Sequence, residues 1–201
     1  MQATDILSAE HRVILQVTAA LDAAADRLDA GQPVRPGFMR DAVRFMRDYS
    51  DGYHHAKEEG VLFVALTEAG MPSHAGPVGV MLMEHDRARE LTAGLAEATT
   101  RWAGGDAAMA GTVAECARDY AALLGQHIMK EDHILFPMAG QLLPEDGQDA
   151  LLPAFAMVED AQRGRGSKVS FEELARTLAT EMDVDPDALP EPEFAFACHG
   201  Q

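Results

Sequence analysis

Two ten-residue stretches, HHAKEEGVLF at residues 54–63 and HIMKEDHILF at residues 127–136, indicate the fold and its chemistry together. They are identical at five of ten positions, although 73 residues separate them. Each stretch carries a histidine followed four residues later by a glutamate, in the pairs His54–Glu58 and His127–Glu131. On an α-helix, such residues lie about 40° apart and one turn along the axis. Each stretch therefore projects an imidazole and a carboxylate from one helical face.

Both stretches lie within long amphipathic patterns, in which inward positions recur at spacings of three and four residues. This periodicity predicts helices over 4–30, about 36–69, about 77–102 and about 106–143. Connectors rich in Gly or Pro separate these helices, and Pro137 is expected to end or kink the last one. Long helices joined by short loops pack as antiparallel neighbours. We therefore expect an all-α protein, an antiparallel up-down four-helix bundle with a short helical C-terminal extension.

The predicted inward face of every helix carries one histidine, and two of these faces also carry a glutamate. The six candidate metal-ligating residues are His11, His54, Glu58, His85, His127 and Glu131. An ionised carboxylate in a bundle core costs several kcal/mol unless a cation or hydrogen bonds compensate it. Four nitrogens and two carboxylates suit two divalent ions and are too many for one tetrahedral zinc. Because bundle cores hold carboxylate di-iron and di-manganese sites, the hypothesis is a dinuclear non-haem iron centre.

These motifs resemble the hemerythrin-like HHE cation-binding domain family over about residues 5–143. The residues that carry the resemblance are Glu10-His11-Arg12, His54-His55-Ala-Lys-Glu58-Glu59 with Leu62-Phe63, Glu84-His85-Asp86, and His127 with Glu131-Asp132 and Leu135-Phe136-Pro137. The resemblance implies an oxo- or hydroxo-bridged di-iron pair that binds or reacts with O₂, NO or peroxide. Carried over by position, the ligands are the same six residues, with Glu58 and Glu131 bridging. Mn or Zn could accept these ligands as well.

The sequence departs from the oxygen-carrying hemerythrins, which place two histidines one turn apart on the third helix. Here Met81 and Arg89 stand four residues before and after His85, so one imidazole is missing. Fewer protein ligands favour inner-sphere chemistry over reversible oxygen carriage. The oxygen carriers also use a carboxylate five residues after the fourth-helix histidine, where this chain has Asp132. Either Glu131 or Asp132 can therefore bridge.

Several neighbours of these residues have open roles. His55 and Glu59 lie one position off the inward face, where hydrogen bonding to ligands or plain exposure is expected, unless a register shift exchanges them for His54 and Glu58. Lys57 and Lys130 are expected to be solvated helix charges that pair with nearby acids. Core packing is the default for Tyr53 and Tyr120, and a phenol near the metals could also donate a proton or an electron or ligate iron.

Composition limits the partners and the compartment. The 201 residues carry 16 Lys and Arg against 33 Asp and Glu, a formal net charge of −17, and the sequence has no basic cluster. Nucleic acid and anionic membranes are therefore not expected as partners, because both need a positive surface. Cys116 and Cys198 form no CxxC pattern, and neither a signal peptide nor a long apolar run is evident, so a cytoplasmic protein is expected.

We divide the chain at residue 143. Residues 1–143 form the expected cation-binding domain, and residues 144–201 form an acidic, helical extension with a Pro-rich tail and an unknown protein partner. The leading functional hypothesis is a binding or sensing module for O₂, NO or peroxide. The alternatives are a di-iron enzyme acting on peroxide or O₂, such as a catalase-like protein or an oxidase, and metal sequestration without turnover.

Overall fold

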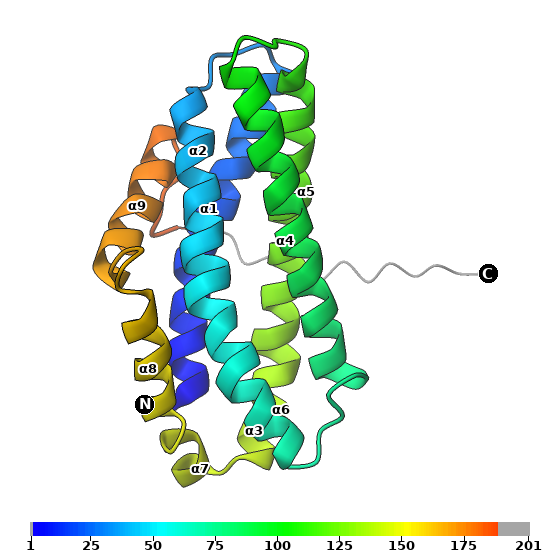
Figure 1. Cartoon of the computed structure of the whole chain (residues 1–201), viewed down its shortest axis with the longest axis vertical. Coiled ribbons are helices and arrows are strands. Elements are labelled where there is room, and N and C mark those ends of the chain that lie inside the picture. The colour runs from blue at the N-terminus through cyan, green and yellow to red at the C-terminus, as the bar shows by residue number, and fades with distance from the viewer. Residues whose placement is uncertain (1, 189–201) are drawn as a thin grey trace, which may run out of the picture.

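Four long helical segments run side by side in the computed structural model, which describes residues 2–188 (Figure 1). They are α1 (Ala3–Asp29), then α2 (Pro36–Phe45) continued by η1 (Met46–His55), η2 (Glu58–Leu62) and α3 (Phe63–Glu68), then α4 (Gly76–Ala103), and finally α5 (Met109–Lys130) continued by η3 (Glu131–Leu135) and α6 (Phe136–Leu142). Helix α5 packs against both α1 and α4, and α2 packs against α4. The predicted all-α bundle is confirmed, and residues 2–188 contain no strand.

Two glycines end helices where the sequence places connectors. Gly31 follows α1 with a φ of 67°, and Gly105 follows α4 with a φ of 101°. Side chains rarely adopt this left-handed backbone region, whereas glycine enters it without a steric penalty. These positions allow the chain to reverse direction within a few residues, which keeps neighbouring helices antiparallel.

The segments η1, η2 and η3 are π-helical, and all three lie on the two helices that carry the repeated motif. A π-helix closes each hydrogen-bonded turn with one more residue than an α-helix, so it rotates the side chains that follow. The turn η3 ends two residues before Pro137, whose ring would collide with the carbonyl four residues earlier in a regular helix. Of the two expected effects of Pro137, an end of the helix is not found, because α6 continues to Leu142.

Buried polar side chains divide the core of the bundle into two apolar parts. One part includes Ile14 of α1 and Leu124 of α5, and the other includes Leu7 of α1 and Leu135 of η3. His11 lies between Leu7 and Ile14 along α1 and is fully buried. The layer that separates the two parts contains the residues of the repeated motifs.

Beyond the bundle, the chain forms α7 (Glu145–Asp149), α8 (Leu152–Gln162) and α9 (Lys168–Glu181). Helix α9 packs against α1 and α2, and α8 packs against η1 (Figure 1). Phe171 and Leu178 of α9 belong to the same apolar core as α1 and α2. The Pro-rich tail expected at the end of the chain lies outside the described residues from position 189 onward. None of the helices within residues 2–188 combines the length and the apolar character needed to cross a bilayer.

Candidate metal centre

All six candidate residues meet in the polar layer of the core. His11 comes from α1, His54 from η1, His85 from α4 and His127 from α5, so each long segment supplies one imidazole. Glu58 and Glu131 come from η2 and η3. None of the six is more than 1% exposed. A site enclosed to this degree excludes bulk water from its donor atoms.

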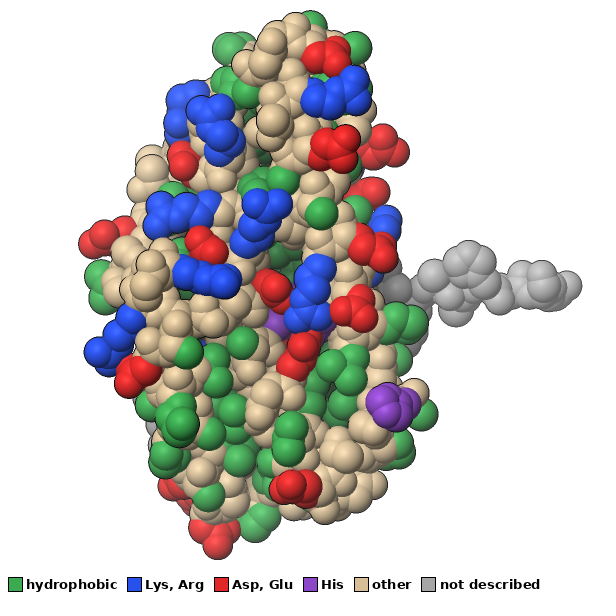
Figure 2. Space-filling model, viewed as in Figure 1, with side chains coloured by type: hydrophobic (Ala, Val, Ile, Leu, Met, Phe, Trp, Pro, Cys, Tyr) green, Lys and Arg blue, Asp and Glu red, His purple; other side chains and the backbone are tan. Residues whose placement is uncertain are grey.

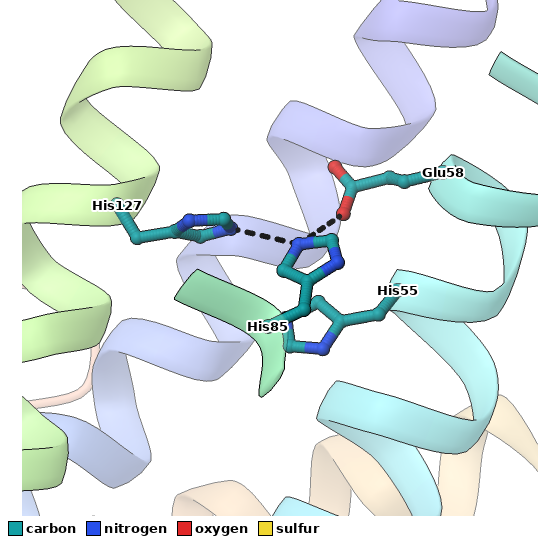
Figure 3. A group of neighbouring side chains, drawn as sticks. All are labelled: His55, Glu58, His85 and His127. Atoms are coloured by element: carbon teal, nitrogen blue, oxygen red, sulfur yellow. Dashed lines mark hydrogen bonds and ion pairs between the residues drawn. The ribbon is translucent and has the colours of Figure 1, made fainter. Parts of the chain in front are cut away.

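The ligand atoms form two groups that share Glu58. One group is His11, His54, Glu58 and Glu131, and the other is His55, Glu58, His85 and His127; within each group the atoms lie within 4.8 Å of one another. Figure 3 shows the second group, with the imidazoles of His85 and His127 directed toward each other and Glu58 reaching over His85. Two adjoining groups of this kind match the donor requirement of a dinuclear centre.

Both glutamates span the two groups. Glu58 places Oε1 3.4 Å from Nε2 of His54 and Oε2 3.4 Å from Nε2 of His85. Glu131 places Oε2 3.2 Å from Nε2 of His11 and 3.3 Å from Nε2 of His127. Each carboxylate therefore faces one histidine from each half of the chain, which is the position that a bridging ligand requires.

Asp132 takes a different position from Glu131. Its Oδ1 lies 3.0 Å from Nδ1 of His11 and accepts a hydrogen bond of 2.6 Å from the hydroxyl of Ser8. The Asp132 side chain is 29% exposed, whereas that of Glu131 is fully buried. Of the two acids, only Glu131 belongs to the ligand groups.

The outer nitrogen of each of these four histidines faces a carboxylate from another helix. The Nδ1···O distances are 3.0 Å for His11 with Asp132, 3.1 Å for His54 with Glu10, 2.7 Å for His85 with Glu59, and 3.0 Å for His127 with Glu84. A carboxylate that holds Nδ1–H leaves Nε2 free to bind a metal and fixes the orientation of the ring. Glu59 is thus one of these partners rather than a merely exposed charge.

Glu10 and Glu84 are functional residues that sequence reasoning missed. Both precede a candidate ligand in the dipeptides Glu10–His11 and Glu84–His85, and this repetition was the available signal. Each glutamate nevertheless contacts a histidine of a different helix. A pattern within one helix cannot reveal that pairing.

His55 is buried in the centre, not exposed. Its ring is 1% exposed, stacks on His85 with centroids 3.8 Å apart, and has no hydrogen bond at either nitrogen with any described residue. The expectation of exposure is wrong because η1 is π-helical, which turns both consecutive histidines inward. His55 thereby joins the group that contains His85 and His127. The sequence predicted one imidazole too few for this group, because the third helix has no second histidine.

Lys57 pairs with nearby acids as expected, but the expectation that it is solvated is wrong. Its ammonium is fully buried, donates to Glu10, lies 3.1 Å from Glu159 and stands 4.0 Å from the centroid of the Tyr53 ring. Lys130 donates to Glu84 in the equivalent way, with a side chain that is 30% exposed. Both lysines therefore neutralise the carboxylates that anchor the histidines.

Neither tyrosine with an open role belongs to the ligand groups. Tyr53 packs beneath Lys57, and its hydroxyl is buried without a hydrogen bond to any described residue. Tyr120 lines a cavity of about 210 Å³ that also includes His55 and Arg89. Histidine atoms are visible at the bottom of a depression near the middle of the face in Figure 2. The cavity gives the centre a route toward solvent on the His55 side.

Burial and neighbouring charges shift the pKa values of the side chains in the centre. Burial alone would lower the pKa values of His11 and His127, but the surrounding carboxylates outweigh it and raise them to about 10 and about 9. Burial, together with the charge of the adjacent His85 ring, lowers the pKa of His55 to about 4. Burial raises the pKa of Glu58, and the charge of Glu131 adds to that rise. Such opposite shifts within one cluster are typical of functional sites.

The inward polar atoms face one another at 3.2–3.4 Å but make few hydrogen bonds. The atoms that make no hydrogen bond with any described residue include Nε2 of His11 and His54, both nitrogens of His55, and both carboxylate oxygens of Glu58 and Glu131. A buried donor or acceptor left unsatisfied costs about 1–3 kcal/mol. Cations between these atoms would satisfy them together, so the residues fit a pair of metal ions.

Comparison with known proteins agrees with this geometry. The family model described as Hemerythrin HHE cation binding domain matches residues 2–139. Uncharacterized proteins of Mycobacterium bovis and Mycobacterium tuberculosis are 24% identical over 177 residues, which cover 88% of this chain and 68% of theirs. No solved structure gives a significant match. The matched family region contains every residue of the two ligand groups.

Proposed function

The chain belongs to the hemerythrin HHE cation-binding family, and on that premise we propose that its centre holds two iron ions and binds or reacts with O₂, NO or peroxide. The observation that carries the proposal is the cluster of buried imidazole nitrogens and carboxylate oxygens in the two ligand groups, most of which make no hydrogen bond with any described residue. Manganese accepts the same donors, so metal identity is part of the proposal. The reducing cytoplasm, expected from the cysteine pattern, is its proposed compartment.

In this proposal, His11 and His54 serve one ion, and His85 and His127 serve the other. Glu58 and Glu131 would serve both ions, because each faces histidines from both halves of the chain. His55 is added to the six residues as a further imidazole for the second ion. When bound, the iron pair supplies redox chemistry and coordination positions for a small ligand.

The protein's own contribution is orientation, charge and exclusion of water. The outer carboxylates hold the rings with Nε2 directed inward, and Lys57 and Lys130 neutralise two of those carboxylates. The two apolar parts of the core close the layer from both ends. Carboxylates that hold metal-ligating histidines in this way fix the orientation of the rings and tune the properties of a bound metal.

A second candidate, an enzyme that consumes peroxide, is favoured by the cavity that includes His55. Its volume of about 210 Å³ exceeds the roughly 30 Å³ that one water occupies in the liquid. A substrate can therefore reach one side of the centre while its other sides remain closed.

The test begins with elemental analysis and an absorption spectrum of freshly purified protein. We expect about two iron atoms per chain, and rapid mixing of the reduced protein with O₂ should give a new charge-transfer band. Reversible loss of this band under vacuum would support binding, whereas peroxide breakdown by the wild type that is lost in Glu58→Ala and His127→Ala would support the enzyme. A metal that exchanges but never changes oxidation state would overturn both.

A further inference from the structure

An arginine-lined groove lies on the bundle surface outside the candidate metal centre. Its volume is about 380 Å³, and it runs between α4 and the segment formed by α2 and η1. The side chains that give it its character are those of Arg40, Arg44, Arg47, Asp48, Thr99 and Thr100. In Figure 2, basic side chains gather on the upper half of the visible face, over α2 and the neighbouring helices. We call this feature the arginine groove.

The local charge of the groove opposes that of the whole protein. Three arginines and one aspartate line it, in a chain whose formal net charge is −17. Arg40, Arg44 and Arg47 follow one another at spacings of four and three residues, so they share a helical face and form a local basic cluster, contrary to the expectation that the chain has none. Like charges at these spacings destabilise a helix by a few tenths of a kcal/mol per pair. The cluster is therefore unfavourable for the free chain unless an anion neutralises it.

The described residues compensate this charge incompletely. No ion pair within residues 2–188 involves Arg40 or Arg47. The Nε of Arg44 is 3.8 Å from Asp48, and the same aspartate is also 3.8 Å from Arg165. One carboxylate at the outer limit of ion pairing is thus shared by two guanidinium groups. At least two guanidinium groups remain available to a ligand.

A buried hydroxyl provides an independent sign of a missing partner. Thr99 lines the groove, is 1% exposed, and its Oγ1 makes no hydrogen bond with any described residue. The neighbouring Thr100 hydroxyl instead donates to the carbonyl of Ala96 within its own helix, as threonines in helices often do. Leaving a buried hydroxyl unpaired is costly, so the structure favours a ligand atom at that position.

We propose that the arginine groove binds a small polyanion of the phosphate class, carrying at least two linked phosphoryl groups. Guanidinium groups match phosphate oxygens in bidentate geometry. From Arg40 to Arg47 the helix rises by about 10 Å at 1.5 Å per residue, which suits a chain of phosphates better than one carboxylate. The volume lies in the range of small-molecule sites, about 300–1,000 Å³. A long nucleic acid would meet the acidic remainder of the surface, whereas a compact anion would not.

The groove also adjoins the cavity of the centre. Arg47 lines both the arginine groove and the cavity that includes His55. A bound polyanion would therefore sit one side chain away from the route to the centre. The proposal does not depend on the function proposed for the metals, because no residue of the arginine groove belongs to either ligand group.

Isothermal titration of the metal-loaded full chain with inorganic triphosphate and, separately, with a nucleoside triphosphate tests the proposal. We expect saturable binding of one molecule per chain, weakened by salt because the contacts are ionic. Comparable affinities would identify the phosphate chain as the recognised part, and tighter binding of the nucleotide would show that the base contributes as well. Arg44→Ala and Arg47→Ala should each weaken binding about tenfold. Arg12→Ala, which removes an exposed arginine of α1, should leave it unchanged.

The variant Thr99→Val distinguishes a role of this hydroxyl in ligand binding from a role in protein stability. It should weaken binding several-fold while leaving the unfolding midpoint of the free protein unchanged or higher, because it removes an unpaired buried hydroxyl. Binding that is equally tight in Arg44→Ala and Arg47→Ala, as expected if the phosphates contact the metals directly, would overturn the proposal. Binding of single-stranded DNA or an acidic peptide without any response to triphosphate would overturn it too.

Discussion

Lys57 and Lys130 occupy equivalent positions 73 residues apart, and each donates to the glutamate that anchors the histidine three residues before it. Lys57 pairs with Glu10 behind His54, and Lys130 pairs with Glu84 behind His127. The two halves of the chain thus build the same arrangement of lysine, glutamate and histidine. They differ in solvent access, since the Lys57 side chain is fully buried and that of Lys130 is 30% exposed.

This difference predicts unequal effects on stability. In the metal-free protein, Lys57→Met should lower the free energy of unfolding by about 3 kcal/mol, because it leaves Glu10 buried without its cation. Lys130→Met should cost about 1 kcal/mol or less, because water can reach Glu84. Urea unfolding of both variants at pH 7 measures the two costs. Equal losses would contradict the assignment of Lys57 as the buried member of the pair.

Metal affinity should depend on Glu10 and Glu84 although neither faces the metals. Each holds the outer nitrogen of a histidine, and loss of such a partner typically weakens metal binding about 10–100-fold. We expect losses of this size in Glu10→Gln and Glu84→Gln, measured by competition with a chelator of known affinity. Glu90→Gln alters an exposed glutamate paired with Arg87 and serves as the control. Unchanged affinity in both buried variants would refute the role of these carboxylates.

His55 should make the two ions inequivalent. Its equivalent in the other half is Ile128, an apolar core residue, so only the group containing His85 and His127 gains an extra imidazole. Titration with Co²⁺, followed by absorbance, should resolve two binding steps in the wild type. His55→Ala should weaken one step about tenfold or more and leave the other unchanged, whereas His74→Ala, in an exposed loop, should alter neither. Equal weakening of both steps would contradict this asymmetry.

Acid should destabilise the metal-free protein through Glu59. Burial alone would raise its pKa, but hydrogen bonds from His85 and Arg89 lower it below the ordinary 4.5. The unfolded chain therefore binds a proton that the folded chain does not, so this contribution is complete above about pH 4.5 and is lost as pH falls through the folded pKa. Urea unfolding midpoints should be measured between pH 3 and 7. In the wild type the midpoint should decrease once the pH is lower than about 4.5, and in Glu59→Gln it should decrease less steeply. A parallel decline in the variant would show that other carboxylates account for the loss.

Sequence reasoning succeeded where the information is local. The spacing of His54 with Glu58 and of His127 with Glu131 survives in the structure, because residues four apart stay on one face of a helix. Helix limits agree within a few residues, since Gly and Pro act on the backbone nearby. The sequence could not predict which of Glu131 and Asp132 belongs to the ligand groups. That choice depends on the position of His11, which lies on another helix.

The sequence by itself determined the all-α bundle, the repeated motif and the six residues brought together in the core, because helical periodicity and a repeated spacing are properties of neighbouring residues. Only the tertiary structure decided the burial of His55 and Lys57, the pairing of Glu10 and Glu84 with histidines of other helices, and the gathering of three arginines beside Thr99. These features depend on π-helical turns and on contacts between helices. The interactions that stabilise them join side chains distant in sequence, and the periodicity of a single helix cannot predict such contacts.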